Sequence, residues 1–157
     1  MRVAFVVQRY GTEVVGGAEL HCRWIAEHVA QRHEVTVLTT TAIDYLTWQN
    51  VLPAGVSRVN GVTVRRFPVV RERREEIFFP VANKVCFFEH TDEEERRWLE
   101  EHGPVVPGLV EHLRRQPAGI AAYAELPGGQ HGFDLFSSIR FEAVVDGIES
   151  FAAWVRS

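Results

Sequence analysis

A pair of glycines between a predicted strand and a predicted helix is the strongest candidate for chemistry in this sequence. Residues 3–7 form a short continuous apolar run, which is typical of a strand buried on both faces of a parallel sheet. Apolar residues then recur at helical spacing over residues 18–31. Gly16 and Gly17 directly precede this helix, where bare backbone N–H groups at the positive helix end favour an anion. We therefore predict a phosphate-binding loop at Gly16 and Gly17.

The spacing of these glycines matches neither of the two familiar nucleotide motifs. Together with Gly11 they do not form G-x-G-x-x-G, and no Gly-Lys-Ser/Thr follows them. Spacing alone therefore leaves open a ligand loop or a plain tight turn. A phosphoacceptor receiver domain, a rival for a small α/β chain, needs acidic residues after the first strand, where this sequence has Gln8 and Arg9.

The other residues that could do chemistry do not form a metal site or a disulfide framework. No H-E-x-x-H or comparable ligand spacing occurs among His21, His28, His33, His90, His102 and His112. We therefore expect neither a metal nor a cofactor. The two cysteines are too few for a disulfide framework, and Cys22 is expected to be a small buried hydrophobe on the first helix.

Composition limits the class of protein. The 157 residues are 46% hydrophobic, which suits one globular domain, and a net charge of −4 argues against a nucleic-acid binder. No run approaches the roughly 18 to 20 apolar residues that a membrane-spanning helix needs. The first residues carry no secretory signal pattern, so we expect a cytoplasmic protein.

The elements that must position the glycine pair follow from periodicity and turn signals. Thr91-Asp92-Glu93-Glu94 is a capping box that opens a helix ending at Gly103-Pro104, and residues 71–90 stay ambiguous. The further expected elements are strands over 34–40, 62–67 (after the Asn60-Gly61 turn) and 120–126, and helices over 104–115 and 141–155. We predict a single Rossmann-like α/β domain over residues 1–157, with three α/β/α layers and a parallel sheet of about four strands in order 3-2-1-4.

Residues 1–116 also resemble one known family in the order and spacing of their motifs. Residues 2–7 leading to Gly16-Gly17-Ala18-Glu19, followed by residues 33–39 and 60–67, resemble the N-terminal Rossmann-like domain of family 4 glycosyltransferases with the GT-B fold. The resemblance implies that the N-terminal domain mainly holds the acceptor. It also implies that the paired glycines, here Gly16 and Gly17, approach the donor diphosphate.

Much of that family's equipment is missing from this sequence. The family's second domain binds the nucleotide sugar and carries a Glu-x7-Glu pair, and the length here leaves no room for it. Glu19 with Glu27 and Glu93 with Glu101 match the spacing formally. We interpret both pairs as solvated helix faces, because the chain is rich in glutamate.

Residues 117–157 resemble a different family. Residues 123–134, continuing through 151–155, are similar to the C-terminus of α/β-hydrolase esterases, where a histidine after the last strand completes a Ser-His-Asp triad. His131 stands at the matching place. No Gly-x-Ser-x-Gly elbow and no acid in a matching loop accompany it, so we interpret His131 as a relic and predict no catalytic residue.

The two resemblances together describe a chimera. The sequence predicts a truncated glycosyltransferase N-terminal domain that folds but is inactive alone, with weak residual binding of a nucleotide-sugar diphosphate at Gly16-Gly17. The alternative is an active family 4 glycosyltransferase component completed by a partner or by self-association. An esterase-like hydrolase is a distant third.

Truncation also predicts self-association. Loss of the parent domain's later elements should leave apolar surface uncovered, and residues 77–81 with Val85, Phe87 and Phe88 form the richest candidate. We expect a homo-oligomer, most simply a twofold dimer, joined through the Phe78–Phe88 region, with Arg65 and Arg66 blunting a second route at the sheet edge. The alternative is that this segment folds over its own sheet and the protein is monomeric.

Overall fold

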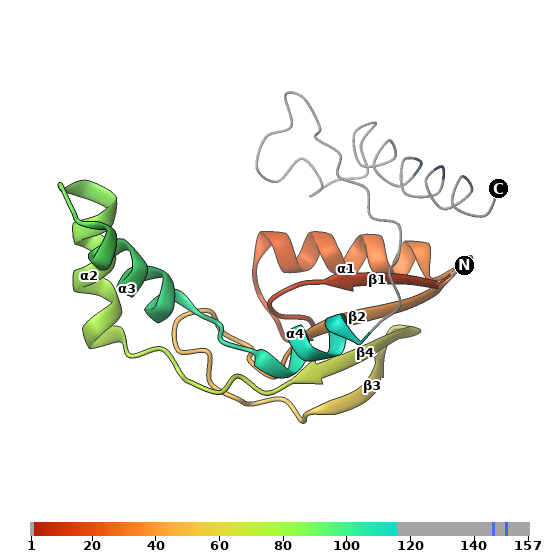
Figure 1. The fold of residues 1–157 in the computed structure, drawn as a ribbon. Helices are drawn as coiled ribbons and strands as arrows, with labels where there is room; N and C mark the ends of the chain where they lie inside the picture. The colour runs from red at the N-terminus through yellow and green to blue at the C-terminus, as the bar shows by residue number, and fades with distance from the viewer. Residues whose placement is uncertain (1, 116–145, 147–149, 151–157) are drawn as a thin grey trace.

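One four-stranded sheet and four helices make up the described part of the chain. The computed structural model describes residues 2–115 together with residues 146 and 150 (Figure 1). In chain order the elements are β1 (Arg2–Val6), α1 (Gly17–Val29), β2 (Glu34–Thr40), β3 (Gly55–Val59), β4 (Val62–Phe67), α2 (Glu75–Phe87), α3 (Asp92–His102) and α4 (Pro107–Arg114). None of the described helices combines the length and apolar character needed to cross a membrane.

Three parallel strands form the part of the sheet that the sequence predicted. β1 pairs with β2 and β2 pairs with β4, with Phe5 beside Val37 and Val37 beside Val64. Helix α1 connects β1 to β2, so the predicted strand–helix–strand unit is confirmed. β1 is at the edge of the described sheet and Val6 is 56% exposed, so the expectation that this strand is buried on both faces is wrong. Side chains alternate across a strand, which places Val37 and Val64 on one face and Thr40 on the other.

The prediction of a purely parallel sheet in order 3-2-1-4 is wrong. The sheet has the order β1-β2-β4-β3, and β3 runs antiparallel to β4. Asn60 and Gly61 both have positive φ (47° and 85°), which suits the tight hairpin that joins the two strands. The Asn-Gly dipeptide signals a strand on each side of the turn, and only the later strand was predicted. The strand predicted over 120–126 lies outside the described residues.

This hairpin also changes the setting of two arginines expected at the sheet edge. β3 covers that edge, so β4 lies inside the sheet. Arg66 is only 6% exposed and donates hydrogen bonds to Ser57 Oγ and to the main-chain oxygen of Tyr10. Arg66 therefore connects β4, β3 and the loop after β1, and it does not lie at an exposed edge where it could hinder strand pairing.

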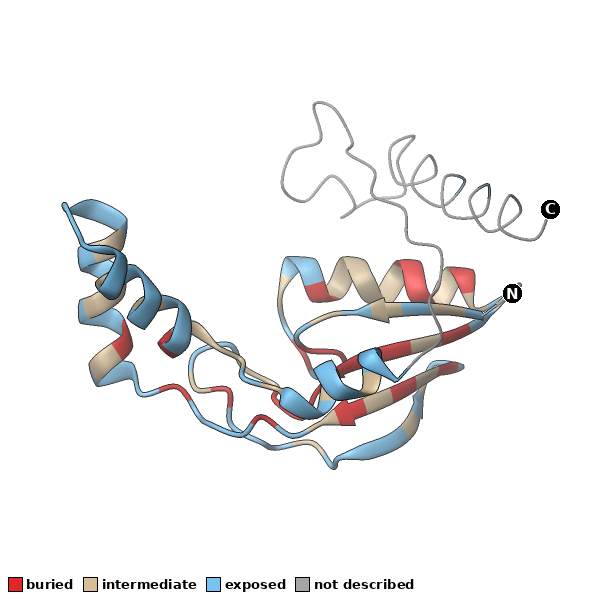
Figure 2. Ribbon diagram, in the orientation of Figure 1, coloured by how far each residue is buried: buried red, intermediate tan, exposed pale blue. Residues whose placement is uncertain are grey.

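The main hydrophobic core lies between the sheet and α1. Ile25, Ala26 and Val29 from α1 pack on valines of β2 and β4 and on Tyr10, and Cys22 is partly buried beside them, as its helical position predicted. Burial raises the pKa of the Cys22 thiol to about 11. Figure 2 shows this buried layer along α1, β2 and β4. The short α4 lies on the opposite face, where it meets Phe67 through His112.

The ambiguous segment 71–90 contains a helix that leaves the sheet. α2 packs against α3, and the two project beyond the carboxyl ends of the parallel strands (Figure 1). We call this pair of helices the arm. Sequence patterning left this segment ambiguous because a charge run precedes an apolar patch, and α2 also contains Pro80 within its span. The arm is mostly exposed, so the alternative that this segment folds over its own sheet is wrong.

The start of α3 is as the sequence predicted. Thr91 Oγ1 accepts a hydrogen bond from Glu94 N (3.3 Å), and the Glu94 carboxylate accepts one from Thr91 N (2.9 Å), which completes the capping box. Hydrogen bonds from Lys84 and from the Thr91 main chain lower the pKa of Glu94 to about 2. Lys84 lies on α2, so this cap also joins the two helices of the arm.

We predict that Thr91→Ala lowers the free energy of unfolding by about 1 kcal/mol, because the first N–H groups of α3 lose their acceptor. Urea denaturation followed by circular dichroism measures this loss. Thr12→Ala is the matched control, since Thr12 is exposed, lies outside any helix, and its hydroxyl donates to the exposed Glu13 carboxylate. Equal losses in the two variants would contradict the role of the cap.

Candidate functional site

Gly16 and Gly17 lie where the sequence placed them, at the start of α1. Gly17 is the first helical residue and Gly16 is its N-cap, and no side chain caps this end of the helix. The Gly16 main-chain oxygen accepts a hydrogen bond from Leu20 N (3.0 Å). Since no described side chain caps the helix, the N–H groups of its first turn are available at the end that follows the β1 loop, at the carboxyl end of the sheet, where α/β proteins bind ligands.

Gly16 is required for a reason that the sequence did not reveal. A Cβ atom at Gly16 would lie 2.1 Å from Glu19 Oε2 and 2.9 Å from Arg9 Nη2. Both distances are shorter than any real carbon contact, and the side chains involved are buried. The glycine is therefore needed to make room for the Arg9–Glu19 pair.

The Arg9–Glu19 ion pair is the feature of this site that sequence reasoning missed. Arg9 and Glu19 are only 4% and 8% exposed. Arg9 Nε and Nη2 both donate to Glu19 Oε1, at 3.0 and 2.6 Å. The interpretation of Glu19 as part of a solvated helix face is therefore wrong. Its partner stands ten residues earlier, in a loop, where no helical spacing rule connects the two.

Arg9 also joins the glycine loop to the loop after β2, residues 41–50. Its Nη1 donates to the main-chain oxygen of Ile43 (3.1 Å), and its guanidinium carbon lies 5.3 Å from the centre of the Tyr45 ring. In the same loop Asp44 Oδ1 accepts from the N–H groups of Leu46 and Thr47. These bonds lower the pKa of Asp44 although burial opposes the shift.

Other arginines near the glycine loop are also engaged. Arg23 Nη1 donates to the main-chain oxygen of Gly11 (2.8 Å), and Arg66 Nη2 donates to that of Tyr10 (3.0 Å). Tyr10 itself is fully buried, and burial raises the pKa of its hydroxyl. The loop is thus held by cations that are committed to its own carbonyl oxygens and to Glu19.

The other glutamates with Glu-x7-Glu spacing do not gather at this site. Glu27 is partly buried on α1 and accepts from Asn60 Nδ2 (2.8 Å). Glu93 is exposed and pairs with Arg96, as expected for a solvated face. Glu101 is only 6% exposed and pairs with Arg74 at the base of the arm, so its interpretation as solvated is wrong.

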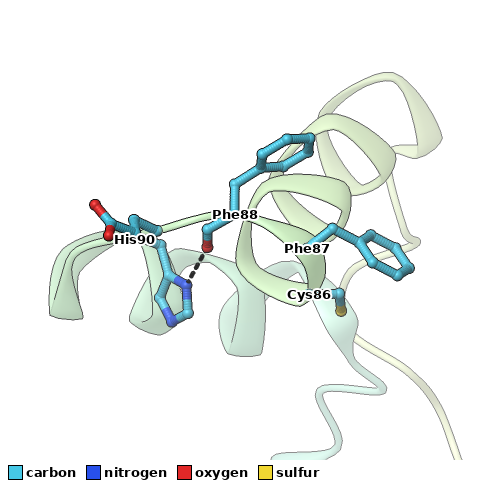
Figure 3. A pocket seen from close by; sticks show the side chains of 5 residues that line it. Cys86, Phe87, Phe88 and His90 are labelled. Carbon is cyan, nitrogen blue, oxygen red and sulfur yellow. Dashed lines mark hydrogen bonds between the residues drawn. The ribbon is translucent and has the colours of Figure 1, made fainter.

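Two hollows lie elsewhere on the described part of the chain. A groove of about 370 Å³ on the α4 face is lined by Val6, Gln8, Thr40, Pro104 and Leu109 among others. An open hollow of about 630 Å³ is lined by Cys86–His90 at the arm, far from the glycine pair. Figure 3 shows Phe87 and Phe88 pointing in different directions there, with His90 Nδ1 beside the Phe88 main-chain oxygen.

Comparison with protein families, curated proteins and solved structures finds no significant match to this chain. Residues 2–115, 146 and 150 contain no group of three or more His, Cys, Asp or Glu side chains placed to hold a metal ion. His131 lies outside the described residues.

We predict that Gly16→Ala lowers the free energy of unfolding by about 1–3 kcal/mol, because the added methyl displaces the Arg9–Glu19 pair. Gly17→Ala is the matched control: Gly17 is exposed and helical, so alanine there should not destabilise the protein. Chemical denaturation of both variants measures the difference. Equal stability of the two variants would contradict the steric role of Gly16.

Proposed function

We propose that the chain is a truncated, chimeric glycosyltransferase N-terminal domain of the acceptor-holding type, which folds but has no catalytic activity alone. Its Gly16-Gly17 loop binds the diphosphate of a nucleotide sugar weakly. The observation that carries this proposal is the uncapped start of α1, with two glycines, at the carboxyl end of a parallel strand–helix–strand unit. Such a helix start offers N–H donors and a positive dipole to a phosphate.

The electrostatics of the loop support weak binding. A helix dipole stabilises an anion by only about 0.3–1 kcal/mol, whereas a millimolar ligand already needs about 4 kcal/mol. Arg9, Arg23 and Arg66 are committed to Glu19 and to loop carbonyls. The Glu19 carboxylate, close to Gly16, further opposes a second negative charge.

The chimeric part of the proposal is supported by sequence. The hydrolase-like residues 117–157 supply His131 without a nucleophilic elbow, so acyl transfer lacks its first step. The competing idea, an active transferase completed by a partner or by a second copy, requires saturable donor binding and sugar transfer.

Isothermal titration with UDP-, GDP- and TDP-sugars tests the proposal. We predict binding no tighter than millimolar and no sugar transfer or donor hydrolysis. Gly17→Asp is the diagnostic variant, because a carboxylate in the first helical turn suits the helix dipole yet repels phosphate, so the heat of binding should vanish while the fold persists. Micromolar saturation with turnover would favour the active transferase, and unchanged binding by Gly17→Asp would place the ligand elsewhere.

We also propose that the protein self-associates through the outer surface of the arm. Phe79, Phe87 and Phe88 are 48%, 77% and 63% exposed, which leaves a large apolar area on the arm. Phe78 was expected in this interface, but it is buried at the base of α2 and packs on Arg73. The proposed contact surface therefore excludes Phe78 and centres on the exposed phenylalanines.

Light scattering at micromolar concentration measures this association. We predict a mass of about twice 17.9 kDa for the dimer, falling to one chain in Phe79→Asp, because a charge replaces apolar contact. Val15→Asp is the matched control, since Val15 is exposed in the glycine loop, away from the arm. A mass near 17.9 kDa that Phe79→Asp leaves unchanged would refute the interface.

A further inference from the structure

The arm is joined to the rest of the protein around one main-chain oxygen, that of His102 at the end of α3. Trp48 Nε1, from the loop after β2, donates to this oxygen at 2.8 Å. Arg73, just before α2, donates to it through both Nε (3.2 Å) and Nη2. The Arg73 main-chain N–H donates to the Thr47 oxygen (2.7 Å), which closes the junction. We call this group of contacts the arm junction.

The His102 imidazole is partly buried and packs on two aromatic rings of the arm. It lies edge-on to Phe78 and Trp98, with ring centres 5.6 and 5.5 Å apart. Its Nδ1 is buried and has no hydrogen-bond partner among the described residues. The Arg73 guanidinium carbon lies 4.1 Å from the centre of the same Phe78 ring. The Arg73 cation and the titratable His102 ring therefore both contact the Phe78 ring.

The acidic groups near the junction interact with its arginines. Glu101, adjacent to His102, forms ion pairs with Arg74 at 2.5 Å and with Arg71 at 3.7 Å. Asp44 and Glu75 interact electrostatically with Arg73.

Tyr45 also interacts electrostatically with Arg73. The end of α3 would favour a cation through its dipole, but its last carbonyl already accepts from Arg73 and Trp48. A proton on His102 would thus meet the neighbouring Arg73 charge, while the nearby Glu101 carboxylate pairs with Arg71 and Arg74 through Oε1 and leaves its buried Oε2 without a hydrogen-bond partner among the described residues. Burial and the Arg73 cation accordingly lower the pKa of His102.

We propose that His102 is a proton-operated latch for the arm. The neutral ring packs on Phe78 and Trp98 and keeps the end of α3 on Trp48 and Arg73. The imidazolium leaves this aromatic site, which releases Trp48 and loosens the arm from the loop of residues 41–50. This loop also contacts Arg9 through Ile43, so release reaches the edge of the glycine loop.

The direction of the pH dependence follows from the lowered pKa. A histidine whose folded-state pKa lies below its unfolded value stabilises the junction fully above about pH 6.5, and the stabilisation falls as pH drops toward the folded-state pKa. The latch is therefore closed at neutral pH and opens on acidification. It does not depend on whether the glycine loop binds phosphate.

Nuclear magnetic resonance of the full chain tests the latch between about pH 7.5 and about pH 5. We expect the His102 ring proton to titrate with a midpoint below 6.5, and the Trp48 indole N–H signal to leave its hydrogen-bonded position with the same midpoint. A Trp48 signal that does not move, or that moves with a midpoint unlike that of His102, would overturn the proposal. This measurement needs no variant.

Two variants separate the latch from general acid unfolding. His102→Phe keeps an edge-on aromatic ring and the main-chain oxygen but cannot take a proton, so the Trp48 signal should stay in place at acidic pH. His90→Phe is the matched control, because His90 is exposed near the far end of the arm, and this variant should retain the transition. Persistence of the transition in His102→Phe would overturn the proposal.

Discussion

The structure around the candidate site depends on the burial of one ion pair, Arg9 with Glu19. Two charges inside a protein are tolerated only when they satisfy each other, and removing one partner of such a pair costs about 3–5 kcal/mol. Here Arg9 uses three nitrogen atoms, two on Glu19 and one on the Ile43 oxygen. The loop after β1, the first turn of α1 and the loop after β2 are therefore held at one point. A side chain at residue 16 would overlap the Arg9–Glu19 pair, so only glycine fits at this position.

The loop of residues 41–50 extends this constraint to the arm. At one end Ile43 accepts from Arg9, and at the other Trp48 and Thr47 meet Arg73 and the end of α3. Trp48 is buried against Ala42, Val69 and Val106, which form a second, smaller core. Among the described residues, this loop therefore contacts both the glycine loop and the arm. Small changes in that loop would affect both ends.

Two electrostatic effects at the glycine pair oppose each other. The helix start favours an anion through its N–H groups, whereas the carboxylate of Glu19 lies beside Gly16 and disfavours one. A strong phosphate site resolves such competition with a free cation over the loop, but the arginines here hold the protein's own carbonyl and carboxylate oxygens. This balance is the physical basis for proposing a weak ligand loop in an incomplete transferase domain.

Local features of the sequence determined much of this fold. The apolar runs of β1 and β2, the Thr91 capping box and the position of Gly16 and Gly17 before α1 all follow from neighbouring residues, because each depends on spacing within one element or turn. The function implied by the family resemblances remains a prediction, and so does the hydrolase-like strand–helix unit over residues 117–157.

Only the tertiary structure decided the rest. α2 contains Pro80 within its span and places Phe78 against Arg73 and His102, contacts that spacing along the chain does not predict. Glu19 and Glu101 look like surface glutamates in the sequence, yet both are buried beside arginines from other segments. A charged side chain can be buried when folding brings an oppositely charged side chain close to it. The spacing of residues along the sequence does not predict which side chain that will be.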